Sequence, residues 1–141
     1  MAHYYMQKRL SDLKIEKKYG ISSCGTEANN GESATKYALY TISQYGVDMS
    51  KHRAKNTENA NIENADYIIC MTKMHYNYVT RKYPKLEDKV YILKEMVLNK
   101  EEYVDIDDPW GLDLQVYSGC AKEIVDSVDK LIIKLEAGEK I

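Results

Sequence analysis

Apolar positions along the chain switch between helical and strand-like spacing. The strongest helical pattern covers residues 114–135, where apolar residues recur at steps of three and four and Gly138 follows as a stop signal. The same spacing predicts helices over residues 2–13 and 73–83, the second ending before Pro84. We therefore expect several amphipathic helices.

A further helix is predicted after a polar loop at residues 27–31. Ser33 is a suitable N-cap, the apolar residues that follow share one helical face, and Gly46 marks the C-terminal end. Residues 47–61 are polar and irregular, which predicts a long loop.

Three short apolar segments, residues 19–24, 66–71 and 89–93, have the length and composition of strands. Strands that alternate with helices are typical of a parallel sheet covered by helices on both faces. We therefore expect an α/β fold, a flavodoxin-like three-layer sandwich. Residues 1–141 are expected to form a single domain, because the length fits one core and no linker or repeat interrupts it.

Composition and charge exclude several classes of protein. The net charge of −2 gives no basic field for nucleic acid or an anionic membrane surface, and no apolar run reaches the length of a membrane span. Cys24, Cys70 and Cys120 are widely spaced and form no Cys-x-x-Cys pair, which disfavours a zinc site. An odd number of separated thiols suits a reducing cytoplasm.

Six segments, taken in order, carry a family pattern. They are Ile21 to Thr26, Tyr45 to Ala54, Ala65 to Thr72, Tyr83-Pro84, Val90 to Glu95, and Asp105 to Gly111. Together they resemble the low-molecular-weight protein tyrosine phosphatase family, which includes bacterial protein arginine phosphatases and a branch of arsenate reductases. The resemblance extends over essentially the whole chain. It implies a cytoplasmic, cofactor-free phosphatase acting on phosphotyrosine or phosphoarginine in a protein, or on a small phosphoester.

The front of the chain departs from this family pattern. The family opens with a central strand that runs into a Cys-x5-Arg loop, and Met1-Ala2-His3 falls where the residues after that loop would be. The resemblance therefore implies that the first central strand and the phosphate-binding loop, roughly fifteen residues, are missing. We interpret the chain as N-terminally truncated, and we favour a misassigned start over a natural truncation.

Loss of a central strand would leave backbone groups unpaired on its two neighbours. If the start is correct, the segment near Ile21 is expected to pair with the strand near Ile68. Alternatively, two chains are expected to associate through the exposed sheet and form a dimer.

No other cysteine supplies the missing nucleophile motif. The positions six residues after the three cysteines carry Asn30, Tyr76 and Asp126 rather than Arg. None of these segments has the glycine and small-residue content that lets backbone N–H groups close around a phosphate. We therefore predict that the chain as given has no nucleophile and no phosphatase activity.

The residues that remain for chemistry centre on an Asp-Pro-Trp-Gly turn before the last helix. The resemblance implies that Asp108 is the general acid, that Trp110 lines the substrate pocket, and that His52 supports the phosphate loop from behind. On spacing alone, a turn-capping role for Asp108 is the stronger interpretation. An exposed loop position is an equal alternative for His52, and His3 and His75 are expected on helix surfaces.

Three functional alternatives stay open. The carboxylates of Asp105, Asp107 and Asp108 could ligate Mg²⁺, although the resemblance implies no metal. The arsenate reductase branch requires additional redox cysteines, and the cysteines here do not show that arrangement. A pseudophosphatase, which keeps the fold and binds partners without catalysis, is the rival from a different functional class.

Overall fold

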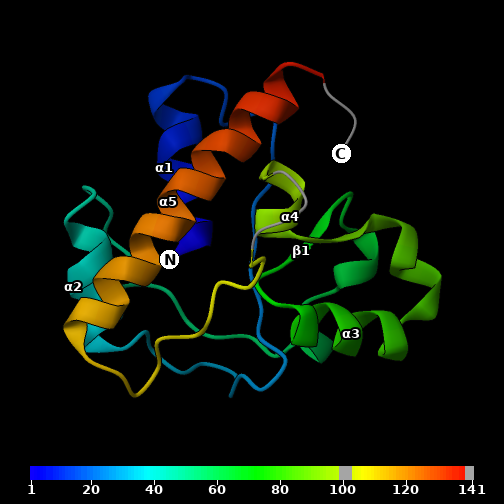
Figure 1. Cartoon of the computed structure of the whole chain (residues 1–141), viewed down its shortest axis with the longest axis horizontal. Helices are drawn as coiled ribbons and strands as arrows, with labels where there is room; N and C mark the ends of the chain where they lie inside the picture. Colours follow the sequence, from blue (N-terminus) through cyan, green and yellow to red (C-terminus); the bar gives the residue numbers. More distant parts are fainter. Residues whose placement is uncertain (99–102, 139–141) are drawn as a thin grey trace.

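The protein is described here by a computed structural model that covers residues 1–98 and 103–138. Its helices and strands, in chain order, are α1 (Ala2–Asp12), α2 (Lys36–Ser43), β1 (Ile68–Cys70), α3 (Lys73–Lys82), β2 (Val90–Ile92), α4 (Leu93–Val97) and α5 (Leu114–Glu136) (Figure 1). Three short 3-10 helices join them, η1 (Thr57–Asn59), η2 (Ile62–Asn64) and η3 (Pro84–Lys89).

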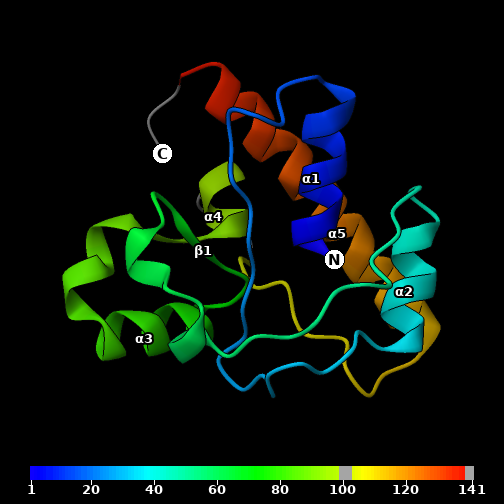
Figure 2. The same ribbon diagram turned by 180° about the vertical axis from the view of Figure 1, so that it is seen from behind.

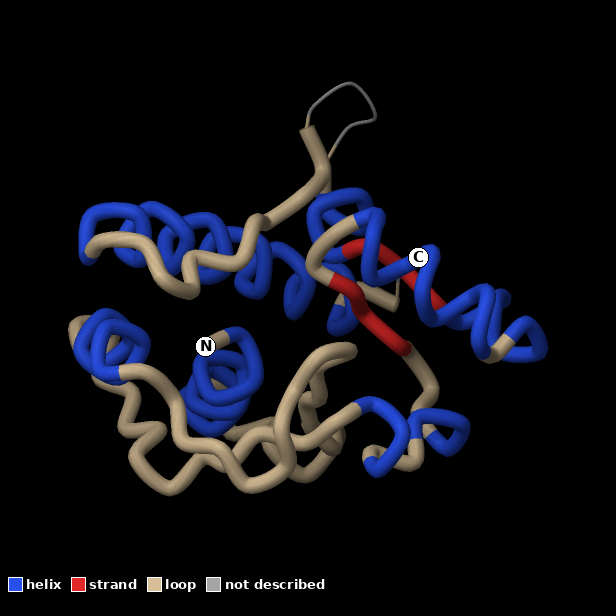
Figure 3. The backbone as a smooth tube through the Cα atoms, turned by 90° about the horizontal axis from the view of Figure 1, so that it is seen from below, coloured by secondary structure: helices blue, strands red, loops and turns tan. Residues whose placement is uncertain are grey.

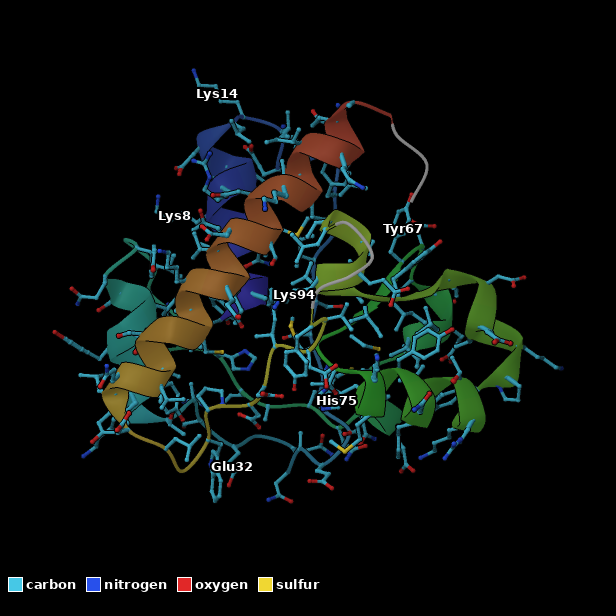
Figure 4. All side chains as sticks on the ribbon, viewed as in Figure 1. Lys8, Lys14, Glu32, Tyr67, His75 and Lys94 are labelled. Carbon is cyan, nitrogen blue, oxygen red and sulfur yellow. The ribbon has the colours of Figure 1, made fainter. Side chains whose placement is uncertain are left out.

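Helix α5 is the central support of the helical side of the molecule. It packs against α1, α2 and α4, and its apolar stripe enters a large core that includes Leu10 of α1 and Ile42 of α2. The Asp113 side chain caps its N-terminus by accepting the Val116 N–H at 3.0 Å. Lys94 of α4, labelled in Figure 4, extends to Glu123 of α5 at 3.4 Å. The predicted helix of residues 114–135 is confirmed.

Strands β1 and β2 form a parallel pair in which Ile68, Ile69 and Cys70 face Val90, Tyr91 and Ile92. Their side chains alternate between the two faces of the sheet, as strand geometry requires. Ile69 and Tyr91 pack against the large core beside α5, whereas Ile68 and Val90 join a smaller cluster with Val79 of α3. Helices thus cover both faces of the sheet (Figure 3), and the expected α/β fold is confirmed.

The prediction of a strand at residues 19–24 is wrong. This segment is extended, and Figure 2 shows it crossing the molecule after α1, but within the described residues it belongs to no β ladder. The expected pairing with the strand near Ile68 is therefore not formed. Side chains hold the segment instead: Gln7 donates to the Ile21 carbonyl at 3.5 Å, and the Tyr19 hydroxyl donates to Glu136 at 2.6 Å. Apolar alternation gives a strand only where a neighbouring strand is available.

Two local predictions also need correction. The N-cap of α2 is Thr35, whose Oγ1 accepts the Ala38 N–H at 3.2 Å, whereas Ser33 forms an isolated antiparallel bridge with Arg53. The strand predicted over residues 89–93 ends at Ile92, because the backbone turns directly into α4.

In the described parts of the chain, no helix combines the length and apolar character needed to cross a membrane.

Candidate functional site

Asp108 lies on an exposed turn that leads into α5. Its Oδ1 accepts the Trp110 N–H at 3.0 Å, and the Pro109 carbonyl accepts the Leu112 N–H at 2.9 Å. Gly111 has a φ of +80°, a conformation that glycine adopts without the strain a side chain would cause. This Asx-type turn uses one carboxylate oxygen of Asp108, and the residue as a whole is exposed.

The loop before this turn is fastened to the carboxyl end of β1. The Ile106 N–H donates to the Met71 carbonyl at 2.9 Å, and Asp105 Oδ1 accepts the Lys73 N–H at 2.8 Å, where α3 begins. Ile106 and Pro109 are buried, so their side chains anchor the loop to the body of the protein. Ligands in open parallel sheets bind at this edge of the sheet, which makes it a suitable position for a catalytic carboxyl group.

Trp110 is the most exposed large apolar side chain of the molecule's described part, with 73% of its surface accessible. No aromatic or cationic side chain stacks on its indole ring among the described residues. An indole at this position is free to contact a ligand that approaches Asp108.

His52 belongs to a separate cluster at the start of α1. Its ring packs edge-on against Tyr4 with centroids 5.3 Å apart, and against His3 at 6.1 Å. His3 Nδ1 lies 2.7 Å from Ser23 Oγ, at hydrogen-bond distance. His3 is partly buried rather than a free surface residue of its helix, which corrects the expectation from sequence.

Both imidazoles of this cluster are held toward their neutral form. Burial lowers the pKa of His3, and the nearby charges of His52 and the Met1 amine lower it further. Burial is also the main cause that lowers the pKa of His52, and the nearby charges of the Met1 amine and Arg53 lower it further. A neutral imidazole can accept a hydrogen bond, so the pair can orient neighbouring groups without carrying charge.

Two of the three thiols, Cys70 and Cys120, are buried and have raised pKa values. Burial is the main cause that raises the pKa of Cys120 to about 11, and the Cys120 thiol donates to the Asp107 carbonyl at 3.6 Å. Burial likewise raises the pKa of Cys70 to about 11. Cys24 is exposed and accepts a hydrogen bond from Thr57 Oγ1 at 3.5 Å. Both buried cysteines are therefore protonated near neutral pH.

The structure brings some of the sequence-predicted residues together and separates others. Asp108 and Trp110 share one turn, but no hydrogen bond or ring contact joins either of them to His52 within residues 1–98 and 103–138. In that same part of the chain, no group of three His, Cys, Asp or Glu side chains is placed to hold a metal ion. The site therefore offers an exposed carboxyl group beside an exposed indole.

The family profile described as low molecular weight phosphotyrosine protein phosphatase matches residues 1–140. The chain belongs to this phosphatase family.

Its relatives in this family include proteins named as arginine phosphatases and proteins named as tyrosine phosphatases. A protein-arginine-phosphatase of Geobacillus stearothermophilus is 28% identical over 82% of this chain and 76% of its own length. The low molecular weight protein-tyrosine-phosphatase PtpB of Staphylococcus epidermidis is 32% identical over 82% of this chain and 79% of its own length.

A solved structure agrees with this assignment. The low molecular weight protein tyrosine phosphatase from T. tengcongensis superimposes with a TM-score of 0.84 at 30% identity, covering 94% of this chain and 88% of that one. The fold and family expected from the six sequence segments are thus confirmed.

Proposed function

We propose that residues 1–141 form one domain of a cytoplasmic low molecular weight protein phosphatase in which Asp108 is the general acid. The observation that supports this role is the exposed Asp108 carboxylate, held on an anchored turn at the carboxyl edge of β1. Trp110 is proposed to line the substrate pocket, because its exposed indole lies on the same turn. His52 is proposed to support the phosphate-binding backbone from behind, as a neutral imidazole.

The role of Asp108 follows from the chemistry of phosphoryl transfer. When a thiolate attacks phosphorus and the bond to the leaving group breaks, the leaving oxygen or nitrogen gains a negative charge. A protonated carboxyl group within hydrogen-bond reach donates its proton to that atom. The resulting carboxylate then removes a proton from the water that hydrolyses the phosphocysteine, and the thiolate and the acid are both regenerated.

The substrate proposed for this domain is a phosphorylated protein side chain. Both phosphotyrosine and phosphoarginine carry a planar group that can pack on an indole, by aromatic stacking or by a cation–π contact. The single aromatic residue of the Asp-Pro-Trp-Gly turn and the similarity to a protein-arginine-phosphatase favour phosphoarginine. Comparing the turnover of matched phosphotyrosine and phosphoarginine peptides, by a form of the domain to which the family's Cys-x5-Arg loop has been added, decides between them.

We propose further that residues 1–141 alone do not catalyse the reaction. Two observations support this: no cysteine is followed by Arg at the sixth position, and the two buried thiols have pKa values raised to about 11. The test is hydrolysis of p-nitrophenyl phosphate by the purified chain, by Asp108→Asn, and by Asp126→Asn as a matched control on the exposed face of α5. All three are expected to give the same background rate. Turnover that Asp108→Asn abolishes and Asp126→Asn retains would show that a nucleophile exists elsewhere in the chain.

The rival function is a non-catalytic pseudophosphatase, a regulatory binding module, and the exposed Trp110 supports a binding surface at this turn. The chain has one tryptophan, so its fluorescence reports directly on ligands at this turn. Saturable quenching by a phosphopeptide, confirmed by calorimetric titration and absent with the unphosphorylated peptide, would support a binding module. A flat titration would argue against it.

A further inference from the structure

The outward face of α3 is a surface that the phosphatase chemistry does not use. Met74, Asn77, Tyr78, Arg81 and Lys82 line an open hollow of about 720 Å³ there. These residues recur at steps of three and one, so they share one side of the helix. The opposite side is occupied by Val79, which is buried in the smaller core cluster.

The segment that carries this surface is cationic in a chain that is acidic overall, and its lining cations are Arg81 and Lys82. Residues 73–85 contain four Lys or Arg and no Asp or Glu, whereas the whole chain carries a net charge of −2. Local charge of one sign on a folded surface favours ligands of the opposite sign.

The cations at the end of α3 differ in how far they are already neutralised. Lys82 pairs with Glu58, donates to the Tyr78 hydroxyl at 3.1 Å, and lies 5.4 Å from the centroid of the Tyr78 ring. These contacts fix Lys82 and the aromatic ring together. The Arg81 guanidinium, by contrast, forms no ion pair or hydrogen bond in the described part of the chain, and the residue is exposed. Its guanidinium donors face solvent.

The apolar part of the surface lies beside these charges. Met74 is 68% exposed, and Tyr78, one helical turn further along, is also exposed. A methionine side chain adapts to the shape of an apolar partner, and a ring held by Lys82 offers a rigid wall.

We propose that this α3 face docks an acidic segment of a partner protein, with carboxylates on Arg81 and an apolar side chain between Met74 and Tyr78. The Arg guanidinium matches a carboxylate through two parallel hydrogen bonds, which gives the surface a preference for Asp and Glu. Figure 4 shows His75 at the inner end of α3. From that end, helix α3 extends away from the turn that precedes α5 (Figure 1).

The experiment measures the anisotropy of a short fluorescein-labelled peptide built from Glu, Asp and Leu, titrated with the full chain. The matching peptide with Lys in place of every acidic residue is the ligand control. Arg81→Glu is expected to weaken binding by at least about tenfold, and Arg81→Gln by a smaller factor. Tyr78→Ala tests the apolar contact, and added salt is expected to weaken binding. Lys130→Glu makes a charge reversal on the exposed face of α5 and is expected to leave the affinity unchanged.

Circular dichroism melts of each variant show whether it is folded. If Arg81→Glu unfolds, Arg81→Gln still tests the proposal, because it removes the charge without adding an acid at the helix end. Equal binding of the acidic and basic peptides, or equal affinity for the wild type and Arg81→Gln, would overturn the proposal. Sedimentation velocity over a range of concentrations separates the remaining case. Self-association that Arg81→Gln abolishes would assign the face to a second copy of the chain and would also overturn the proposal.

Discussion

The helical side and the sheet side of this molecule differ in how many residues their hydrophobic cores bury. Among the described residues, the core around α5 contains fifteen buried residues, whereas the cluster between α3 and the sheet contains four, Ile62, Cys70, Val79 and Val90. Burial of apolar surface is the main favourable term in folding, so the helical side contributes most of the stability. The difference teaches that a phosphatase-type fold can keep most of its structural support apart from the edge of the sheet where catalysis is proposed.

The proposed catalytic edge is joined to the larger core by one loop, residues 103–113. Ile106 belongs to the large core, and its N–H donates to the Met71 carbonyl at the end of β1. The loop that carries Asp108 is therefore attached both to the larger core and to strand β1, although Asp108 itself is exposed.

The largest effect is expected for Leu131→Ala. Leu131 is 1% exposed in the C-terminal half of α5, and its truncation should lower the free energy of unfolding by about 3 kcal/mol, from lost burial and the cavity left behind. Urea denaturation followed by circular dichroism measures the change. Ile133→Ala, two residues along the same helix and 68% exposed, is the control and should cost less than about 0.5 kcal/mol. Equal losses in the two variants would contradict the placement of the core.

Val79→Ala tests the sheet side in the same way. Val79 is 4% exposed, and removing its two methyl groups should lower the free energy of unfolding by about 2 kcal/mol. Hydrogen exchange in this variant should accelerate more in α3 and β2 than in α5, because local opening begins where fewer apolar contacts hold the chain. A uniform acceleration would mean that the two sides unfold as one unit.

Thr72→Ala is expected to have a smaller effect, also on the sheet side. The Thr72 hydroxyl caps α3 by accepting the His75 N–H at 3.1 Å, and its loss should lower the free energy of unfolding by about 1 kcal/mol. Thr72→Ser keeps the cap and should recover most of that loss in a urea titration. If serine fails to rescue, the threonine methyl group rather than the hydroxyl carries the stability.

The smallest effect is a dependence on pH at the start of α1. His3 and His52 have pKa values below their ordinary 6.5, so the unfolded chain binds protons more readily than the folded chain does. Stability is fully present above about pH 6.5 and falls as the pH drops through the lowered values. Urea midpoints at several pH values between about 7.5 and 5 measure the slope, and His52→Gln should flatten it. An unchanged slope in His52→Gln would mean that other groups cause the loss.

The sequence correctly predicts those helices and strands that depend on the pattern of neighbouring residues. The spacing of apolar residues locates residues 114–135 because α5 buries a single continuous stripe, and the apolar run around Ile69 locates β1. The alternation in residues 19–24 misleads, since a strand also requires a neighbour, and no local pattern supplies one. Helix α4 escapes detection because Leu93 continues directly from β2 without a cap or a breaker.

The candidate site divides in the same manner. Asp108 and Trp110 stand in a short turn with recognisable composition, so sequence alone can place them side by side. His3, Ser23 and His52 come from separate segments, and only the packing of α1 against the loops brings the two imidazoles together. No periodicity or spacing in the sequence records that contact.

Lys18 and Tyr19 both bind Glu136, the last residue of α5, at 3.0 and 2.6 Å. This clasp joins the beginning of the extended run to the end of α5, 117 positions away in the sequence. It can close only after α5 has packed into the fold, because closing so long a loop costs conformational entropy. Packing of α5 therefore adds a long-range attachment of Lys18 and Tyr19 to the local contacts that Gln7 and His3 make with the same segment.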